Sequence, residues 1–358
     1  MRDEDKGMSR LAVVILNWNG EGFLRRFLPR VVEYSTGDYA PQGCEVVVAV
    51  ADNASADGSL GWLSDTYVSA GDDRVRVIAL DANYGFTGGY NRALAHETLA
   101  GFDSYLLLNS DVDVTPGWLV PLAAILTADA RVGAVMPKLL AYGREDYFEY
   151  AGACGGFIDA LGYPFCRGRI FGTVEKDRGQ YDTVRDIFWA SGAAMLVRAD
   201  LWRELGGLDE AFFAHMEEID FCWRLHRQGF RVVVCPESAV YHVGGGALPA
   251  TSPRKTYLNF RNNLAMLYKN LSHRLFAAVY FVRFWADGLQ ALGYLATGKS
   301  SFAGAVFRGH ADFWLRMREK MVRRTGSGGY ALPPKEVLYR GSVAWRYVFG
   351  WRTFGNMM

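Results

Sequence analysis

The 358-residue chain is 50% hydrophobic and 22% charged, a composition typical of a globular protein with roughly two domains. Its five cysteines lie far apart and form no Cys-x-x-Cys motif, which argues against a zinc site and a disulfide framework and fits a reducing compartment. Residues 1–10 are polar and charged, so we expect no signal peptide and a cytoplasmic location.

The net charge of +1 conceals an asymmetry along the chain. Residues 251–358 hold 17 Lys+Arg and 4 Asp+Glu, a net charge of +13, which leaves −12 for residues 1–250. Because composition also shifts after the glycines at 244–246, we predict two domains, 1–250 and 251–358. A basic surface of this kind suits nucleic acid or an anionic membrane.

Strand and helix signals alternate through the N-terminal part of the chain. Apolar runs predict buried strands at residues 11–16, 45–50, 75–79 and 104–108, with helices between them at 22–33, 59–69 and 87–99. This alternation predicts an α/β fold with a Rossmann-like, mostly parallel central sheet flanked by helices. Asn, Asp and Gly cluster after the strands, at the edge where such sheets bind ligands.

The pattern changes after residue 140. Frequent glycines and short aromatic runs between residues 141 and 185 predict β-hairpins or a mobile loop over the ligand site. Regular structure returns at 188–197, followed by expected helices at 199–205 and 217–228 and a strand at 231–234.

The basic C-terminal region is predicted to be helical, with helices at 257–270 and 274–297. Residues 275–298 are mostly apolar but contain Arg283, Asp287 and Gln290, which disfavours a membrane span. Two interpretations stay equally open: a helix that lies in the membrane interface, and a helical subdomain that packs on the sheet.

Two carboxylates follow the fourth strand. Asp111 and Asp113 are one residue apart, directly after the apolar run Leu106–Leu108. They repel each other unless a cation lies between them, and hard ions such as Mg²⁺ or Mn²⁺ take oxygen ligands and bridge to phosphates. The alternative for an isolated Asp-x-Asp is a solvated turn.

Other polar residues follow the second and third strands. Asp52 can accept a hydrogen bond from a nucleobase or a ribose, or it can cap the following helix. The glycine-rich run from Asn83 to Asn91 lets a ligand approach the backbone and opens a helix whose N–H groups can bind an anion. It lacks the Gly-x-Gly-x-x-Gly dinucleotide pattern.

A second acidic group lies at Glu217, Glu218 and Asp220. Acids in a first helical turn are favoured by the helix dipole, but three together cost more repulsion than capping requires. A general base within reach of a substrate hydroxyl is the sharper interpretation. His242 follows a strand-like run before a glycine, and an imidazole there could join Asp113 at one metal.

Together these motifs resemble the family 2 glycosyltransferases of the GT-A fold, and most closely their bacterial rhamnosyltransferase-like members. The matching runs occur in the family's order and cover roughly residues 10–246. They are residues 14–19, 52–59, 83–91, 109–113, 190–194, 206–213, 217–220 and His242. The run at 261–263 and the basic aromatic tail also look like this subgroup's membrane-associated extension.

The resemblance implies an inverting, Mg²⁺- or Mn²⁺-dependent transfer from a nucleotide-sugar donor, dTDP-rhamnose or a UDP-sugar. The acceptor would be a glycan or a lipid-linked saccharide for surface polysaccharide synthesis, with peripheral contact at the inner face of the cell membrane. By this analogy Asp52 contacts the base, Asp111 the ribose or a metal-bound water, Asp113 the metal, and His242 the metal or the diphosphate. The remaining donor-binding residues would be Asn17, Asn53, Asn83, Gly85, Phe86, Asn91, Ser191 and Gly192.

Glu218 takes the place of the family's catalytic base, where Asp is usual, and Glu217 precedes it. Asp220 matches a further acid of the family and could share or take this role. The residues alone do not decide among the three.

Two other functions compete with this interpretation. A nucleotidyltransferase also uses a Rossmann-like sheet with metal-binding acids, but the turn after the first strand, residues 17–20, lacks the Arg and Lys that bind a triphosphate. A nucleic-acid-binding module could use the basic aromatic tail, yet its apolar helix pattern suits lipid better and no recognition motif is present. The sequence indicates no oligomeric state.

Overall fold

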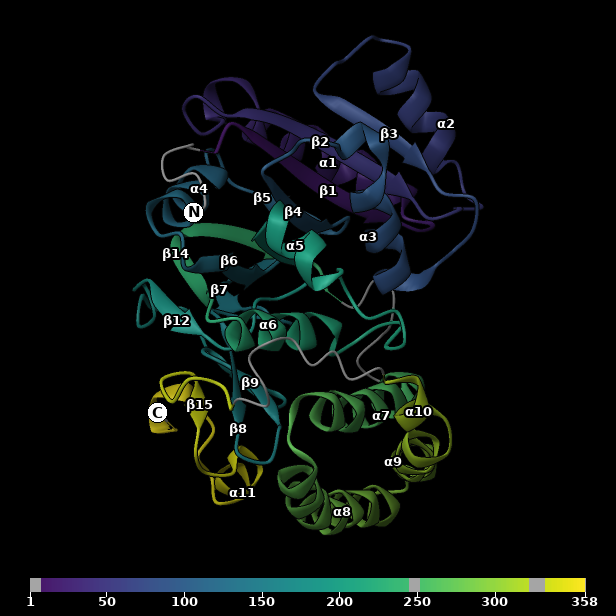
Figure 1. Cartoon of the computed structure of the whole chain (residues 1–358), viewed down its shortest axis with the longest axis vertical. Helices are drawn as coiled ribbons and strands as arrows, with labels where there is room; N and C mark the ends of the chain where they lie inside the picture. The colour runs from purple at the N-terminus through teal and green to yellow at the C-terminus, as the bar shows by residue number, and fades with distance from the viewer. Residues whose placement is uncertain (1–7, 245–251, 322–331, 358) are drawn as a thin grey trace.

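The structure is a computed structural model that describes residues 8–244, 252–321 and 332–357 (Figure 1). The domain boundary predicted at residue 250 lies outside the described residues. The division into domains 1–250 and 251–358 therefore stays a prediction, although contacts described below cross it.

The centre of the molecule is a ten-stranded mixed sheet with the order β12-β14-β6-β13-β4-β1-β2-β3, to which β5 and β7 add beside β14 and β6. Its strands are β1 (Arg10–Asn17), β2 (Glu45–Asp52), β3 (Val75–Ala79), β4 (Ser104–Asn109), β5 (Val112–Val114), β6 (Val132–Ala141), β7 (Arg144–Phe148), β12 (Arg185–Ile187), β13 (Ala194–Arg198) and β14 (Arg231–His242). The four strands predicted from the N-terminal sequence pair in parallel, as expected. β13 then pairs antiparallel with both β4 and β6, so the sheet is less uniformly parallel than predicted.

Helices cover this sheet, and most begin close to the predicted positions. They are α1 (Glu21–Ser35), α2 (Ser59–Leu63), α3 (Gly85–Ala95), α4 (Leu119–Ala128), α5 (Ala199–Leu205) and α6 (Glu217–Arg227), with short helical turns at Gly37–Tyr39, Ser64–Val68 and Glu97–Leu99. α1 buries an apolar stripe with helical spacing, including Leu24, Leu28 and Val31, against β2 and β5. α5 ends at Gly206, whose φ of 71° is the left-handed conformation that glycine adopts at helix ends.

The glycine-rich region from 141 to 185 forms β-hairpins, which was one of the two structures predicted for it. A second sheet has the order β11-β10-β9-β8-β15, built from β8 (Gly156–Asp159), β9 (Pro164–Cys166), β10 (Arg169–Ile170), β11 (Thr173–Val174) and β15 (Leu338–Tyr339). β15 pairs in parallel with β8, so the C-terminal segment completes a sheet that begins in the middle of the chain (Figure 1).

The C-terminal helices lie together below the central sheet, next to α6 (Figure 1). They are α7 (Pro253–Asn270), α8 (His273–Ala296), α9 (Ser300–Asp312) and α10 (Arg318–Lys320), with helical turns at Phe313–Met317 and Phe354–Asn356, and α11 (Val343–Val348) follows β15. The predicted helices at 257–270 and 274–297 are thus confirmed. Within the described ranges, no helix combines the length and the apolar character that a membrane crossing requires.

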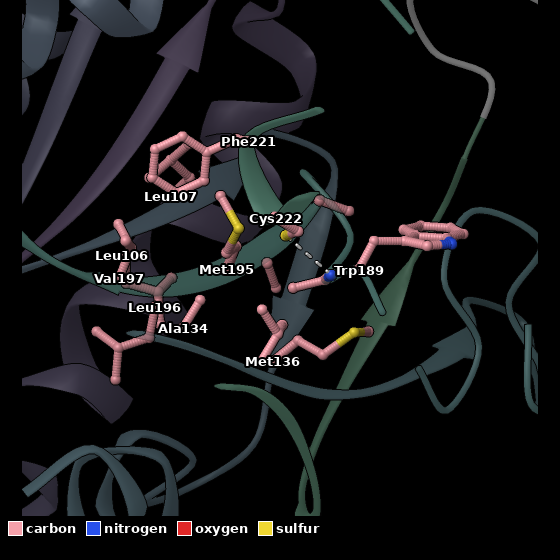
Figure 2. Close-up of a cluster of buried hydrophobic side chains, with 14 of the residues drawn as sticks. Leu106, Leu107, Ala134, Met136, Trp189, Met195, Leu196, Val197, Phe221 and Cys222 are labelled. Carbon is pink, nitrogen blue, oxygen red and sulfur yellow. Dashed lines mark hydrogen bonds between the residues drawn. The ribbon is translucent and has the colours of Figure 1, made fainter. Parts of the chain in front are cut away.

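α6 is anchored on the main hydrophobic core (Figure 2). Its Phe221 and Cys222 pack among buried side chains of β4 and β13, such as Leu107 and Met195. The Cys222 thiol accepts a hydrogen bond from the Ala190 N–H at 3.4 Å. The apolar face of α6 therefore fixes the direction in which the acids of its first turn are presented.

Candidate active site

Polar side chains from neighbouring strand ends meet at one edge of the central sheet. At the end of β1, Asn17 donates from Nδ2 to Oδ2 of Asp52, the last residue of β2, at 2.9 Å. The other oxygen of Asp52 accepts from the Ser55 N–H at 2.8 Å. Asn17 and Asp52 are both fully buried, so in this structure they organise the turns around the edge.

The next strand adds a second pair of amides. Asn53 donates from Nδ2 to Asn83 Oδ1 and to the Gly85 carbonyl, each at 3.1 Å. Gly85 has a φ of 69° and begins α3, and a Cβ there would lie 2.7 Å from the Phe213 ring. Only glycine fits this position. At the start of α3 the Gly85 N–H donates to Asn83 Oδ1 at 2.9 Å and the Thr87 N–H to the Phe213 carbonyl at 3.5 Å.

The acidic pair after β4 has separate partners. Asp111 Oδ1 lies 3.1 Å from Nε2 of His242, whose Nδ1 lies 3.4 Å from Glu149 Oε1. Although burial lowers the pKa of His242, the hydrogen bonds to Asp111 and Glu149 outweigh it and raise the pKa to about 10. Asp113 instead accepts from the Arg30 guanidinium at 2.6 Å.

The predicted metal ligands fit a divalent ion in chemistry but are not preassembled. Asp111, Asp113 and His242 offer two hard carboxylates and one imidazole, and Oδ1 of Asp113 is buried with no hydrogen-bond partner. Yet in the part of the chain that the structure describes, no three His, Cys, Asp or Glu side chains converge closely enough to form a ready-made metal site. Arg30 neutralises Asp113 in the place that a cation would take.

The second acidic group begins α6. Glu217 is buried and Glu218 is half-buried, and Oε2 of each side chain has no hydrogen-bond partner. Burial raises the pKa of Glu218 to about 7, and burial together with the neighbouring Glu218 charge raises the pKa of Glu217 well above its ordinary value. A carboxylate with a pKa near neutrality and a free oxygen is suited to general base catalysis.

Phe86 and Gly192 connect the sheet edge to this base. A Cβ on Gly192 would lie 3.2 Å from Phe86 Cζ and 3.9 Å from Glu218 Cβ, so the glycine keeps a narrow space between them open. Ser191 before it is buried and donates from its hydroxyl to the Ala151 carbonyl at 3.0 Å. The structure thus brings the predicted donor residues Phe86 and Gly192 beside Glu218.

Two predicted site residues are occupied elsewhere. Asp220 is fully buried and accepts from Arg224 at 2.9 Å, Lys269 at 2.8 Å and Asn270 at 2.8 Å. Burial opposes its ionisation, but Lys269 and Arg224 outweigh this and hold the pKa of Asp220 below its usual range. Asn91 donates to the Leu208 carbonyl at 2.8 Å and accepts from the Leu208 N–H at 2.9 Å. Both side chains are therefore engaged in contacts within the protein.

Sequence reasoning missed three residues that shape the site. Glu149 and Arg30 are separated from their partners His242 and Asp113 by many residues, so no local pattern announces them. Asn262 of α7 donates from Nδ2 to the carbonyls of Phe212, Ala214 and His215, at 2.8 to 3.0 Å. The run at 261–263 stood out in the sequence only through its resemblance to the subgroup's C-terminal extension, which does not indicate these contacts.

The loop held by Asn262 is strained. Phe213, His215 and Met216 have φ values of 68°, 70° and 76°, a region that non-glycine residues adopt rarely. This loop leads directly into Glu217. Strain of this kind persists only where surrounding contacts enforce it, and it concentrates at functional sites.

The comparisons identify the class of protein. The model of the family described as glycosyltransferase like family 2 matches residues 9–266, so the chain belongs to this family. It is 29% identical over 247 residues to the N-acetylglucosaminyl-diphospho-decaprenol L-rhamnosyltransferase of Mycobacterium tuberculosis, which covers 65% of this chain and 75% of that protein.

Solved structures agree on the fold. GalNAc-T7 with UDP, GalNAc and Mn²⁺ superposes with a TM-score of 0.59 and 17% identity over 92% of this chain, which spans 60% of that one. The mannosyltransferase PcManGT of Pyrobaculum calidifontis, with GDP-Man and Mn²⁺, gives a TM-score of 0.52 and 14% identity over 86% of this chain and 88% of that one.

The predicted GT-A fold with a helical C-terminal region is therefore confirmed, and so is a rhamnosyltransferase-like member of glycosyltransferase family 2. The chain is a glycosyltransferase, and the nucleotidyltransferase and nucleic-acid-binding alternatives are set aside.

Proposed function

We propose that this glycosyltransferase transfers rhamnose or a hexose, with inversion, from a nucleotide-diphosphate donor to a lipid-linked saccharide of the cell envelope. The Mycobacterium relative, whose name gives a rhamnosyl transfer onto a lipid-linked N-acetylglucosamine diphosphate, supports dTDP-rhamnose as the first donor to test. UDP-sugars are the second group. A glycan without lipid is the second acceptor class.

The observation that carries this proposal is the position of Glu218. Its free carboxylate oxygen and its pKa of about 7 suit removal of a proton from an acceptor hydroxyl as that oxygen attacks the sugar. The side chain lies beside Gly192 and Phe86, at the end of the edge where the donor would bind. A single base acting opposite the leaving group gives inversion.

Burial and the neighbouring Glu218 charge raise the pKa of Glu217 and favour its neutral form, so Glu218 would carry the negative charge of the pair. Asp220 is proposed to hold α6 in place rather than to act as the base, since three buried donors occupy its oxygens. Asn91 would likewise support the site by fixing the loop at Leu208.

The donor would lie along the sheet edge. Asp52 and Asn17, which are buried, would shape the pocket for the base, while Asn53, Asn83 and Gly85 would shape the pocket for the rest of the nucleotide. These groups are within hydrogen-bond distance of one another, so the edge is already ordered before a donor binds. Phe86, Ser191 and Gly192 would bound the sugar.

Asp111, Asp113 and His242 would hold Mg²⁺ or Mn²⁺, with Arg30 released from Asp113 and a proton lost from His242 when the ion binds. Such an ion neutralises the charge that develops on the leaving nucleoside diphosphate. The unpartnered Oδ1 of Asp113 supports this assignment. The two structural neighbours that contain Mn²⁺ have the same fold, which supports a divalent metal here.

We also propose that α8 docks on the inner face of the membrane. Arg283 and Asp287, two of the charges that interrupt its apolar sequence, are buried and paired at 3.1 Å, and Tyr163 and His310 also contact Asp287. Phe276, Val279 and Ala291 are buried as well, but many other apolar side chains of α8 face outward. Large ones with more than half of their surface exposed are Phe281, Phe284, Trp285, Leu289 and Leu292.

An outward apolar face of this size is unusual in water and typical of an interfacial helix with basic residues nearby. Arg318 and Trp314 border a groove of about 770 Å³ between Tyr268 and Trp285, where an acyl or prenyl chain could lie. Sedimentation with vesicles that contain anionic lipid, compared with vesicles of neutral lipid alone, tests the docking. Phe281→Ser with Trp285→Ser should abolish it, whereas Val68→Ser, at an exposed site in the N-terminal half, should not.

The transfer itself is tested by incubating the purified protein with a prenyl-diphosphate N-acetylglucosamine acceptor and either dTDP-rhamnose or UDP-sugars, with Mn²⁺ or with chelator. The proposal expects a metal-dependent product whose new linkage has the inverted anomeric configuration. A product with retained configuration would contradict the assignment of a single base. Transfer that proceeds equally well in chelator would contradict the metal site.

A further inference from the structure

Two cations lie over one exposed tyrosine next to the proposed active site. The Arg169 guanidinium carbon is 4.6 Å from the centre of the Tyr150 ring, and Lys255 Nζ is 5.8 Å from the same centre. Arg169 belongs to the second sheet and Lys255 to the first turn of α7, so two separate parts of the fold bring these charges together. Tyr150 is 45% exposed, which leaves the place open to a ligand.

The first turn of α7 carries positive charges where the helix dipole favours negative ones. The first turn contains no acid but carries Arg254 and Lys255, and Ser252 before it makes no side-chain cap. The first N–H groups of a helix have no intrahelical partner and attract anions, so cations at this end are unfavourable. An anion bound between the helix end and these side chains would offset the repulsion between the cations and the helix dipole.

These cations also lack a dedicated counter-ion. No ion pair within the described ranges involves Lys255 or Arg169. Arg169 is buried, and its terminal nitrogens donate to the Cys166 thiol at 3.1 Å and the Phe171 carbonyl at 3.5 Å, while its Nε has no hydrogen-bond partner. Glu149 attracts both cations, but its oxygens contact His242 and the Ala151 N–H. Burial lowers the pKa of Lys255. The attraction of Glu149 opposes this shift and the repulsion of Arg169 adds to it, so the pKa stays below its usual range.

The position of this group relates it to the active site. Glu149 connects it to His242 at the proposed metal end of the edge. Lys255 also acts on His215, two residues before Glu217 of α6: burial and then the Lys255 charge lower the pKa of His215 to about 4. The cations are therefore electrostatically coupled to residues near both the proposed metal ligands and the acids of α6.

We infer that Lys255, Arg169 and the N-terminus of α7 form a binding site for a diphosphate group. Several convergent donors and a helix N-terminus match a ligand with two linked phosphates better than a single carboxylate. The identity of the molecule that carries the diphosphate rests on the proposed function, which offers two sources: the nucleotide-sugar donor and a prenyl-diphosphate acceptor.

The first test is calorimetric titration of the full chain with inorganic pyrophosphate in the presence of chelator, which separates the site from any metal. We expect Lys255→Met to weaken binding by about tenfold, the loss of one charge-assisted hydrogen bond, and Lys255→Arg to retain most of it. The matched control is Lys299→Met, which removes an exposed lysine at the beginning of another helix, α9. Pyrophosphate that fails to bind the unaltered protein, or binds Lys255→Met and Lys299→Met equally well, would overturn the inference.

The two sources are then separated by kinetics. If the donor supplies the diphosphate, Lys255→Met raises the KM for the nucleotide sugar and weakens nucleoside diphosphate binding. If the acceptor supplies it, only the KM for the prenyl-diphosphate acceptor rises. Both results support the site. The pyrophosphate titration needs no turnover, so Lys255-dependent binding without sugar transfer would contradict the proposed function and leave the diphosphate site standing.

Discussion

Replacing Glu218 with Gln should produce two opposite effects, a loss of transfer and a gain of stability. Glutamine keeps the size of the side chain but cannot accept the acceptor's proton, so kcat should fall by about 10²- to 10⁴-fold with little change in donor binding. A residue whose role is only structural would lose stability along with activity.

The gain in stability follows from the pKa of the carboxyl. Burial raises the pKa of Glu218 from an ordinary value of 4.5 to about 7. At a pH where Glu218 is ionised in the unfolded chain, folding must therefore either bury its charge or take up a proton, and both oppose folding. The full difference corresponds to about 3 kcal/mol, and because the side chain is half-buried and keeps part of its hydration, we expect about 1–2 kcal/mol. The penalty is absent below pH 4.5 and complete above pH 7, since the pKa is raised in the folded state.

The assay is therefore denaturant unfolding of both proteins at pH 4 and pH 8, alongside initial rates of transfer. The Gln variant should exceed the unaltered protein in stability at pH 8 only. Glu237→Gln, at an exposed position of β14, is the control for a change of charge alone. Equal stability of the two proteins at pH 8, or an unchanged kcat, would refute the reasoning. For the unaltered enzyme, kcat should decline as pH falls through about 7, because the base becomes protonated.

Three further predictions concern the residues around this base. Asn262→Ala leaves three carbonyls of the strained loop without their donor, so it should lower the free energy of unfolding by about 2–4 kcal/mol and remove most of kcat. A thermal melt and a rate assay check this, and the control Asn259→Ala, on the same helix, should match the unaltered protein. Asp113→Asn should abolish the stabilisation by Mn²⁺ in the presence of a nucleoside diphosphate, and an unaltered Mn²⁺ response would contradict the metal assignment. Gly192→Val places methyl groups between Phe86 and Glu218 and should raise the KM for the donor, whereas Gly172→Val, where no atom lies within 4 Å of the added Cβ, should not.

The N-terminal half of the fold could be predicted because its signals are local. The apolar runs of β1, β2 and β4 and the polar residues that end them follow from a buried parallel sheet, whose strands are short and hydrophobic on both faces. The antiparallel strand β13 and the long β14 were less visible. Their pairing partners, β4 and β6, are far away in sequence, and no turn pattern indicates antiparallel pairing over that distance.

The candidate site shows the same limit. Glu217 and Glu218 were found because three acids in one helical turn are a local anomaly. Asp220 belonged to the same anomaly, and only the fold separates it from the other two by pairing it with Lys269, 49 residues later. Likewise Arg30, 83 residues before Asp113, could be assigned only once α1 was placed beside β5.

These long-range pairs also bear on the predicted boundary at residue 250. Asp220 on α6 is completely buried, and two of its three partners, Lys269 and Asn270, come from α7 beyond that boundary. Removing one partner from a buried ion pair typically costs about 3–5 kcal/mol, because the remaining charge stays uncompensated. Lys269→Met should therefore destabilise the catalytic half of the chain.

A fragment of residues 1–250 would lose Lys269, Asn270 and the Asn262 amide together. We expect it to unfold at lower denaturant than the full chain and to lack transferase activity even with a soluble acceptor, as circular dichroism and a rate assay would show. A folded and active fragment would mean that α7 serves only to dock the enzyme. The contacts favour the other conclusion: the basic C-terminal region both faces the proposed membrane surface through α8 and holds the acids of α6 in place through α7, so docking and catalysis share one structural element.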